Sequence, residues 1–322
     1  MRTLLGLAFA ILLPAAAAAQ DFPVRPIRLI VPFPPGGPND IIARAVGQRM
    51  QDIGGQPVTI DNRGGAAGVL GTDAVAKAEP DGYTIAITSA GTLAISASLQ
   101  EKLPYDSTKD LKPITLVAKV PEMLVVATSV PASSMADLVA LAQANPGRLN
   151  YASTGIGGMP HLVAELLKMS ANIDIVHVPY RGAAPIVNDL LGQQVQMVFL
   201  DLPILLPQVQ AGKLKPIVVA AKERAATAPE VPTTAEVGFP QVLAENWYGM
   251  VAPGATPPTI VAKLNRLALE AMRSPDVKEK LLGQGTVLAG NSPEEFAAFI
   301  RSEIDKWSKV VAAAGIKLNE NR

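Results

Sequence analysis

The sequence predicts an α/β protein of two lobes, each a mixed or parallel sheet flanked by helices. Two observations lead to this fold class. Short apolar runs typical of buried strands alternate with helix-length patterns, and this alternation starts again near residue 120. The 322 residues also suffice for two domains of ~150 residues each. We expect residues 20–120 and 246–322 to form lobe 1, residues 121–245 to form lobe 2, and a cleft to separate them.

The first residues read as an export signal. Arg2 supplies a positive start, residues 4–13 are apolar, and residues 15–19 offer small residues for cleavage after Ala19. The apolar run is too short for a bilayer, which needs ~20 residues, so we prefer a cleaved signal peptide to a retained anchor. The predicted product is an exported protein beginning at Gln20.

The composition excludes several classes of protein. The chain has no cysteine, which removes disulfides, thiolate metal sites and the lipid-bearing cysteine of a lipoprotein. Its 28 basic and 28 acidic residues balance, so the electrostatic signature of a nucleic-acid binder is missing. We predict no nucleic-acid partner.

The first lobe opens in β-α-β-α-β order. The predicted strands are residues 27–32, 58–61 and 83–88; the predicted helices are residues 69–78 and a segment that ends near residue 51 and is capped by Asn39 or Asp40.

The second lobe repeats the alternation. Its predicted strands are residues 115–120, 123–128, 149–153, 173–178 and 197–200, its helices are residues 134–144, 161–169 and 185–191, and residues 203–211 and 216–221 continue the pattern.

The chain then returns to the first lobe. Residues 247–252 read as a strand that crosses back, and helices over 258–273 and 293–314 close the chain. Ser292 and Glu295 fit a capping box at the start of the last helix. That helix carries an apolar face at helical spacing, which we assign to the core.

The first candidate site is the loop after the first strand. Loops that follow parallel strands lie where α/β folds bind ligands, and two glycines with a helix N-terminus behind them suit a carboxylate or phosphate. A rigid turn without a ligand explains the segment equally well. The candidate ligand-binding residues are Phe33, Pro35, Gly36, Gly37, Asn39 and Asp40, joined by Ser89 after the third strand.

The second candidate is a glycine-rich loop in the other lobe. It lacks the lysine of a phosphate-binding Walker loop and the third glycine of a dinucleotide fingerprint, so it reads as an anion cradle. Two cradles, one per lobe, imply a ligand with negative charge at each end. The candidates here are Ser153, Thr154, Gly155, Ile156, Gly157, Gly158 and His161.

A third loop adds Tyr180, Arg181 and Gly182. Arg181 could bind a carboxylate, or could be a surface arginine packed on Tyr180. Asp201 could accept a hydrogen bond from a ligand amine or hydroxyl, but we favour a role as the cap of the helix that follows.

Enzyme patterns are weak. The nucleophile elbow of the α/β-hydrolases is missing. His161 and Glu165 have the spacing of a metal pair without a visible third ligand, and a loop-bracing histidine is the better interpretation. Ser153, Thr154 and His161 could be drawn as a nucleophile and its base, which keeps a periplasmic hydrolase or lyase as the weaker alternative.

Several sequence blocks resemble one family along nearly the whole mature chain. They are PIRLIVPF (26–33) with Pro35, Gly36 and Gly37, DIIAR (40–44), Asn62-Arg63 with Gly68, PDGYT (80–84), YAS (151–153) with GIGG (155–158) and His161, VPYRG (178–182) and WYG (247–249). The chain resembles the extracytoplasmic receptors of tripartite tricarboxylate transporters, the Bug-type solute-binding proteins.

The resemblance implies a two-lobed, type II-like periplasmic-binding-protein fold. It also implies that the lobes close on a small carboxylic acid, held mainly by backbone amides and water from loops 33–37 and 154–158. The partners would be membrane transporter subunits and the location the periplasm. The receptor would be a monomer with no metal, no cofactor and no enzymatic activity. Residues 61–69 and Pro38 depart from the common pattern, which leaves the acid unidentified, and a receptor that reports to a membrane sensor kinase is an alternative.

Overall fold

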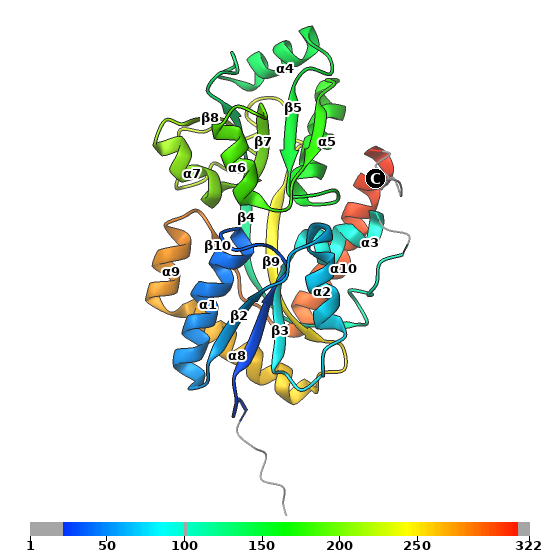
Figure 1. Ribbon diagram of the computed structural model, residues 1–322, viewed down its shortest axis with the longest axis vertical. Helices are drawn as coiled ribbons and strands as arrows, with labels where there is room; N and C mark the ends of the chain where they lie inside the picture. Colours follow the sequence, from blue (N-terminus) through cyan, green and yellow to red (C-terminus); the bar gives the residue numbers. More distant parts are fainter. Residues whose placement is uncertain (1–21, 100–101, 315–322) are drawn as a thin grey trace, which may run out of the picture.

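The protein has two lobes stacked along its long axis and joined by two strands (Figure 1). The structure is a computed structural model that describes residues 22–99 and 102–314. The predicted signal peptide lies outside the described residues. No helix within the described ranges is both long enough and apolar enough to cross a membrane.

The first lobe is built on a sheet with strand order β2-β1-β3-β9-β4-β10. Strands β1, β2 and β3 are parallel, and β9 pairs antiparallel with both β3 and β4. Its elements are β1 (Ile27–Val31), α1 (Pro38–Gly54), β2 (Val58–Asn62), the 3₁₀ turn η1 (Ala66–Gly68), α2 (Val69–Ala76), β3 (Thr84–Ser89), the π-helical turn η2 (Gly91–Ile95), α3 (Ser96–Leu99), α8 (Pro258–Arg273), α9 (Pro275–Leu282), β10 (Val287–Leu288) and α10 (Pro293–Ala314).

The second lobe has strand order β6-β5-β7-β4-β8, in which β4 pairs antiparallel with β7 and β8. Its elements are α4 (Met135–Ala144), β5 (Asn150–Ser153), α5 (Met159–Ala171), β6 (Val176–Pro179), α6 (Ala183–Leu191), β7 (Met197–Asp201), α7 (Leu202–Gln210) and β8 (Leu214–Val219). The two crossing strands are β4 (Leu111–Ala127) and β9 (Glu245–Pro253). Both lobes are α/β with mixed sheets, as the sequence predicts.

The prediction of two separate strands near residue 120 is wrong. Residues 115–120 and 123–128 belong to one strand, β4, which runs through Pro121 without a break. Up to Pro121 the strand pairs with β9, and from Glu122 onward it pairs with β7. One strand therefore serves both sheets, and the lobes meet at the change of partner.

The start of α1 also differs from the prediction. Gly37 is the N-cap, and neither Asn39 nor Asp40 caps the helix. Asn39 donates to the Ile87 carbonyl on β3, and Asp40 accepts from the Gly36 amide. Both side chains tie the first loop to its surroundings, and the first turn of the helix keeps its free amides.

Helix α10 begins and packs as predicted. Ser292 and Glu295 exchange the two hydrogen bonds of a capping box, 2.8 and 3.2 Å long. Its apolar face is buried, with Phe296 and Trp307 fully enclosed.

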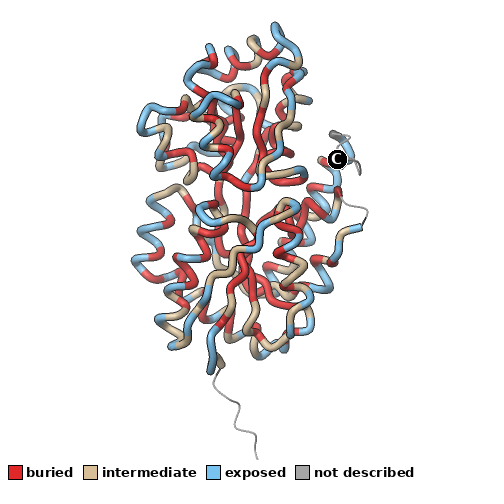
Figure 2. Tube along the Cα trace, viewed as in Figure 1, coloured by how far each residue is buried: buried red, intermediate tan, exposed pale blue. Residues whose placement is uncertain are grey.

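The core continues through the junction of the lobes, where buried chain runs from one sheet into the other (Figure 2). Trp247 on β9 lies edge-on to Phe296 and Phe299 of α10, with ring centroids 6.0 and 5.1 Å away. The indole nitrogens of Trp247 and Trp307 both donate to Glu303 Oε2, at 2.9 Å each. Helix α10 is thereby fixed to a crossing strand.

Candidate functional site

A cavity of about 40 Å³ lies between the lobes, with space for about three water molecules. The first lobe contributes Phe33, Pro34, Pro35, Gly37, Pro38, Asn39, Ala67, Ser89 and Gly91; the second contributes Thr154, Gly158, Met159, Pro160, Gly182, Ala183, Ala184, Leu200 and Asp201. The crossing strands add Glu122, Asn246 and Tyr248. The three candidate loops of the sequence therefore meet at one place.

Three helices begin at the wall of this cavity. The N-caps of α1, α5 and α6 are Gly37, Gly158 and Gly182, and none of these helices has a side-chain cap. The first amides of a helix have no partner within it, and the helix dipole adds about half a positive charge there. Amides from both lobes are thus available to an anion in the cavity.

The lobes touch across the cleft. A methyl group on Gly91 would lie 3.6 Å from the Gly157 carbonyl, and one on Gly155 would lie 3.0 Å from Ala67 Cβ. A methyl on Gly182 would lie 3.2 Å from Pro34. Glycines therefore make up much of the contact, and the structure represents a closed form.

The first loop is braced from behind by Asp40. Its carboxylate accepts hydrogen bonds from the Gly36 amide at 3.0 Å, Arg44 at 2.9 Å and Asn62 at 3.0 Å. Burial works to raise the pKa of Asp40, but these hydrogen bonds outweigh it and the pKa lies below its ordinary value. Of the candidates in this loop, Asp40 and Gly36 are not part of the cavity wall, whereas Phe33, Pro35, Gly37 and Asn39 are.

The second loop is held by two stacked histidines. His161 Nδ1 accepts from the Gly157 amide at 3.2 Å, and His177 Nε2 lies 2.6 Å from Ser153 Oγ. Their ring centroids are 4.2 Å apart. Thr154 and Gly158 line the cavity, but Ser153, Gly157 and His161 do not. His161 therefore braces the loop, as the sequence favours.

The residues of the metal and nucleophile patterns are engaged in contacts within the second lobe. Glu165 accepts from the Tyr151 hydroxyl at 2.5 Å and from Lys168 at 2.9 Å. Among the residues placed by the structure, no three acidic or histidine side chains form a metal-binding group. Ser153 pairs with His177 and not with His161, and its side chain is fully buried.

Burial lowers the pKa of both histidines, that of His177 to about 3. Because the unfolded chain takes up these protons near pH 6.5 and the folded chain does not, stability should fall as the pH drops below 6.5.

We expect His177→Gln to lower the free energy of unfolding at any pH, because it loses the Ser153 contact. The difference in free energy of unfolding between the native protein and the variant should shrink by about 1 kcal/mol between pH 7 and 5.5, after allowance for the part of the ring that solvent reaches. Urea unfolding at both pH values measures this difference. A deficit that is constant with pH would contradict it.

The third loop divides between two spaces. Gly182 lines the inner cavity, whereas Tyr180 and Arg181 line an outer groove of about 450 Å³ together with Gly155 and Ile156. The Tyr180 hydroxyl donates to Asp189 at 2.7 Å, and Arg181 is exposed. Arg181 thus lies outside the inner cavity.

The prediction that Asp201 caps α7 is wrong. Asp201 occupies the N-cap position but makes no capping hydrogen bond. Its carboxylate accepts from Asn246, at 3.1 Å, and from the Tyr248 hydroxyl. Asp201 also lines the cavity, so its place agrees with the alternative of a ligand contact.

Sequence reasoning missed the residues that the crossing strands contribute: Glu122, Asn246 and Tyr248. The available signal was the acid Glu122, which stands between two predicted buried strands.

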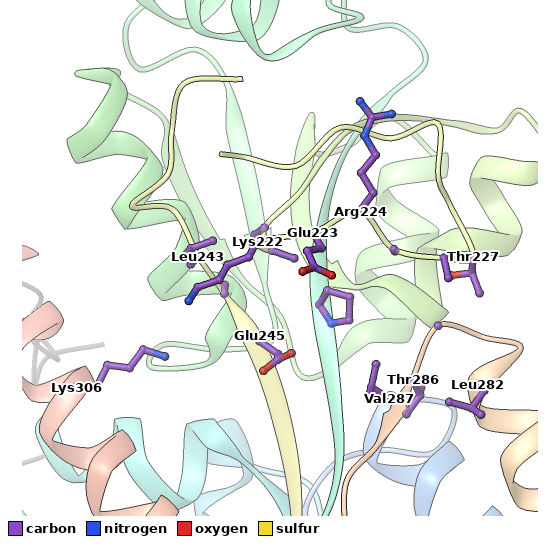
Figure 3. Close-up of a pocket in the computed structure, with 17 residues that line it drawn as sticks. Lys222, Glu223, Arg224, Thr227, Leu243, Glu245, Leu282, Thr286, Val287 and Lys306 are labelled. Carbon is purple, nitrogen blue, oxygen red and sulfur yellow. The ribbon is translucent and has the colours of Figure 1, made fainter. Parts of the chain in front are cut away.

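A larger pocket of about 720 Å³ lies beside the crossing strands (Figure 3). Three of the charged side chains that line it have protein partners: Arg224 pairs with Glu236 at 3.0 Å, Lys306 with Glu303 at 3.2 Å and Glu245 with Lys119 at 3.1 Å. Among its described lining residues, helix N-termini do not converge as they do at the cleft, which remains the better candidate site.

Comparison with known proteins agrees with this geometry. Residues 42–316 match the family described as "Tripartite tricarboxylate transporter family receptor". Protein BugT of Bordetella pertussis is 39% identical over 305 residues, which is 94% of each chain.

Two solved structures are similar over almost their whole length. A Rhodopseudomonas palustris protein solved with adipate has a TM-score of 0.89 and 35% identity, covering 92% of this chain and 99% of that one. MatC of the same species, with bound malate, has a TM-score of 0.86 and 33% identity, covering 90% of this chain and 100% of that one.

Proposed function

Because the chain belongs to the tripartite tricarboxylate transporter receptor family, we propose that it captures a small organic carboxylate between its lobes and presents the closed form to a membrane transporter. The predicted signal peptide over residues 1–19 supports action in the periplasm. The proposal needs no cofactor and no metal, and treats the receptor as a monomer.

The observation that carries the proposal is the meeting of three uncapped helix N-termini, from both lobes, at one cavity. Of the described residues that line this cavity, none is lysine, arginine or histidine. Oriented amides can stabilise a buried carboxylate without a cation. The adipate and malate in the two related structures are small carboxylates, which supports the same ligand class here.

The mechanism is lobe closure. In an open form, a carboxylate binds the amides at one lobe, and the second lobe then completes the hydrogen-bond shell. The ligand shifts the equilibrium only by as much as it prefers the closed form. The glycines of the interface allow the lobes to approach closely around it.

A hydrolase is the weaker proposal. Ser153 Oγ and His177 are in contact, but Ser153 is buried outside the cavity wall and the low pKa of His177 makes it a poor base. We expect candidate acids to be returned unchanged after long incubation.

Thermal unfolding with a panel of mono-, di- and tricarboxylates, aromatic acids and amino acids tests the proposal. The protein is first unfolded and refolded to remove bound ligand. At ~100 times its Kd, a ligand stabilises the fold by about 2.7 kcal/mol, which gives a clear rise in Tm. A flat response across the panel would contradict the carboxylate receptor.

A further inference from the structure

Glu122 is a buried acid without a partner at the junction of the lobes. Glu122 has no solvent exposure, and it lines the cleft cavity. Neither carboxyl oxygen has a hydrogen-bond partner among the described residues. An unsatisfied buried carboxyl group is costly to the fold, so its presence in a cavity wall calls for a partner that enters the cavity.

Asp201 lies directly beside it. The two residues face each other across the antiparallel pair β4 and β7. Asp201 is supplied with donors by Asn246 and Tyr248, whereas Glu122 is not. Burial and the neighbouring Asp201 raise the pKa of Glu122 well above its ordinary value, and burial raises that of Asp201 to about 6.

Once Glu122 and Asp201 ionise, the cavity carries too much negative charge for a purely anionic ligand. Two carboxyl groups stand in a wall whose described residues include no basic side chain. A ligand carboxylate at the helix N-termini would add a further negative charge. A protonated amine on the same ligand would balance the charge and supply N–H donors to the vacant Glu122 oxygens.

We propose that Glu122, with Asp201 beside it, is a cation subsite that receives the ammonium group of a small amino acid. This inference rests on the proposed function, because the helix N-termini take the amino acid's carboxylate. With space for about three waters in the closed cavity, the closed form fits a ligand of few atoms, and any longer side chain must extend toward the outer groove.

Two matched ligand pairs test the subsite by titration calorimetry. L-Alanine and L-lactate differ only by an ammonium in place of a hydroxyl group, and so do L-aspartate and L-malate. At least one amino acid should bind about 10- to 100-fold more tightly than its hydroxy acid, the range of a charge-assisted hydrogen bond.

Glu122→Gln should abolish this preference while leaving binding of the hydroxy acid largely intact. The same variant should raise the Tm of the ligand-free protein, because a neutral amide is easier to bury than a carboxyl group that is ionised in the unfolded state. If Glu122 had only a structural role, its replacement would change the Tm but not the preference for the amino acid. Asp201→Asn provides a second variant, and the exposed Glu294→Gln is the matched control that should change neither quantity.

Two outcomes would overturn the inference. Hydroxy acids that bind as tightly as their amino acids would leave the receptor function standing but exclude the cation subsite, as would a preference that survives in Glu122→Gln. Failure of every acid in the thermal panel and the titrations would instead remove the proposed function, and the subsite with it.

Discussion

Replacing Gly91 by leucine should weaken ligand binding by roughly 10- to 100-fold while sparing the ligand-free fold. Gly91 faces the second lobe, where a Cβ atom would already lie 3.6 Å from the Gly157 carbonyl and 3.7 Å from Gly158 Cα. The remaining leucine atoms must either fill the small cavity or hold the lobes apart. Both results oppose the closed liganded form, and an open form relieves the contact.

Calorimetry with the acid identified by thermal unfolding measures this loss, and small-angle scattering with and without that acid measures closure. Gly91→Ala is the matched control, because 3.6 Å is an ordinary contact for a methyl group. It should bind nearly as well as the native protein. Native affinity in the leucine variant would show that closure across Gly91 is not required for binding.

Trp247→Ala should lower the free energy of unfolding by about 3–5 kcal/mol, the usual cost of deleting a large buried aromatic side chain. The indole is 1% exposed and packs on Phe296 and Phe299. Its removal leaves a void between β9 and α10. It also withdraws one of the two indole donors from Glu303, a nearly buried acid.

Urea unfolding followed by far-UV circular dichroism measures this effect without relying on tryptophan fluorescence. Trp247→Phe should lower the free energy of unfolding by less than the alanine variant does. It gives up the hydrogen bond to Glu303 but keeps most of the packing. A loss below about 1 kcal/mol in the alanine variant would mean that α10 contributes little to the junction of the lobes.

Local patterns predicted much of the fold. The strand-to-helix loops, the capping box at Ser292 and the buried face of α10 depend on neighbouring residues, which the sequence displays directly. The continuity of β4 could not be predicted this way. Pro121 and Glu122 look like a break between two strands, and only the pairing partners on either side keep the strand extended.

In the candidate site, too, features that depend on neighbouring residues could be predicted, whereas features that depend on strand pairing could not. The loops that line the cavity were predicted because each follows a strand and contains glycine. The contact between Ser153 and His177 depends on β5 and β6 being neighbours in register, with Tyr151 opposite His177. Glu122 and Tyr248 reach the cavity only because β4 and β9 cross between the lobes, which no local pattern encodes.

The way in which the chain crosses has a consequence for folding. The second lobe is one uninterrupted segment, because its sheet uses β4 from Glu122 onward and then β5 to β8, whereas the first lobe is interrupted by it and completed by residues from β9 onward. At β4 a continuous strand joins the lobes, so this connection offers no flexible linker that a protease could cut. The first lobe therefore cannot complete its sheet until the whole second lobe and then β9 have been synthesised, because β9 pairs between β3 and β4.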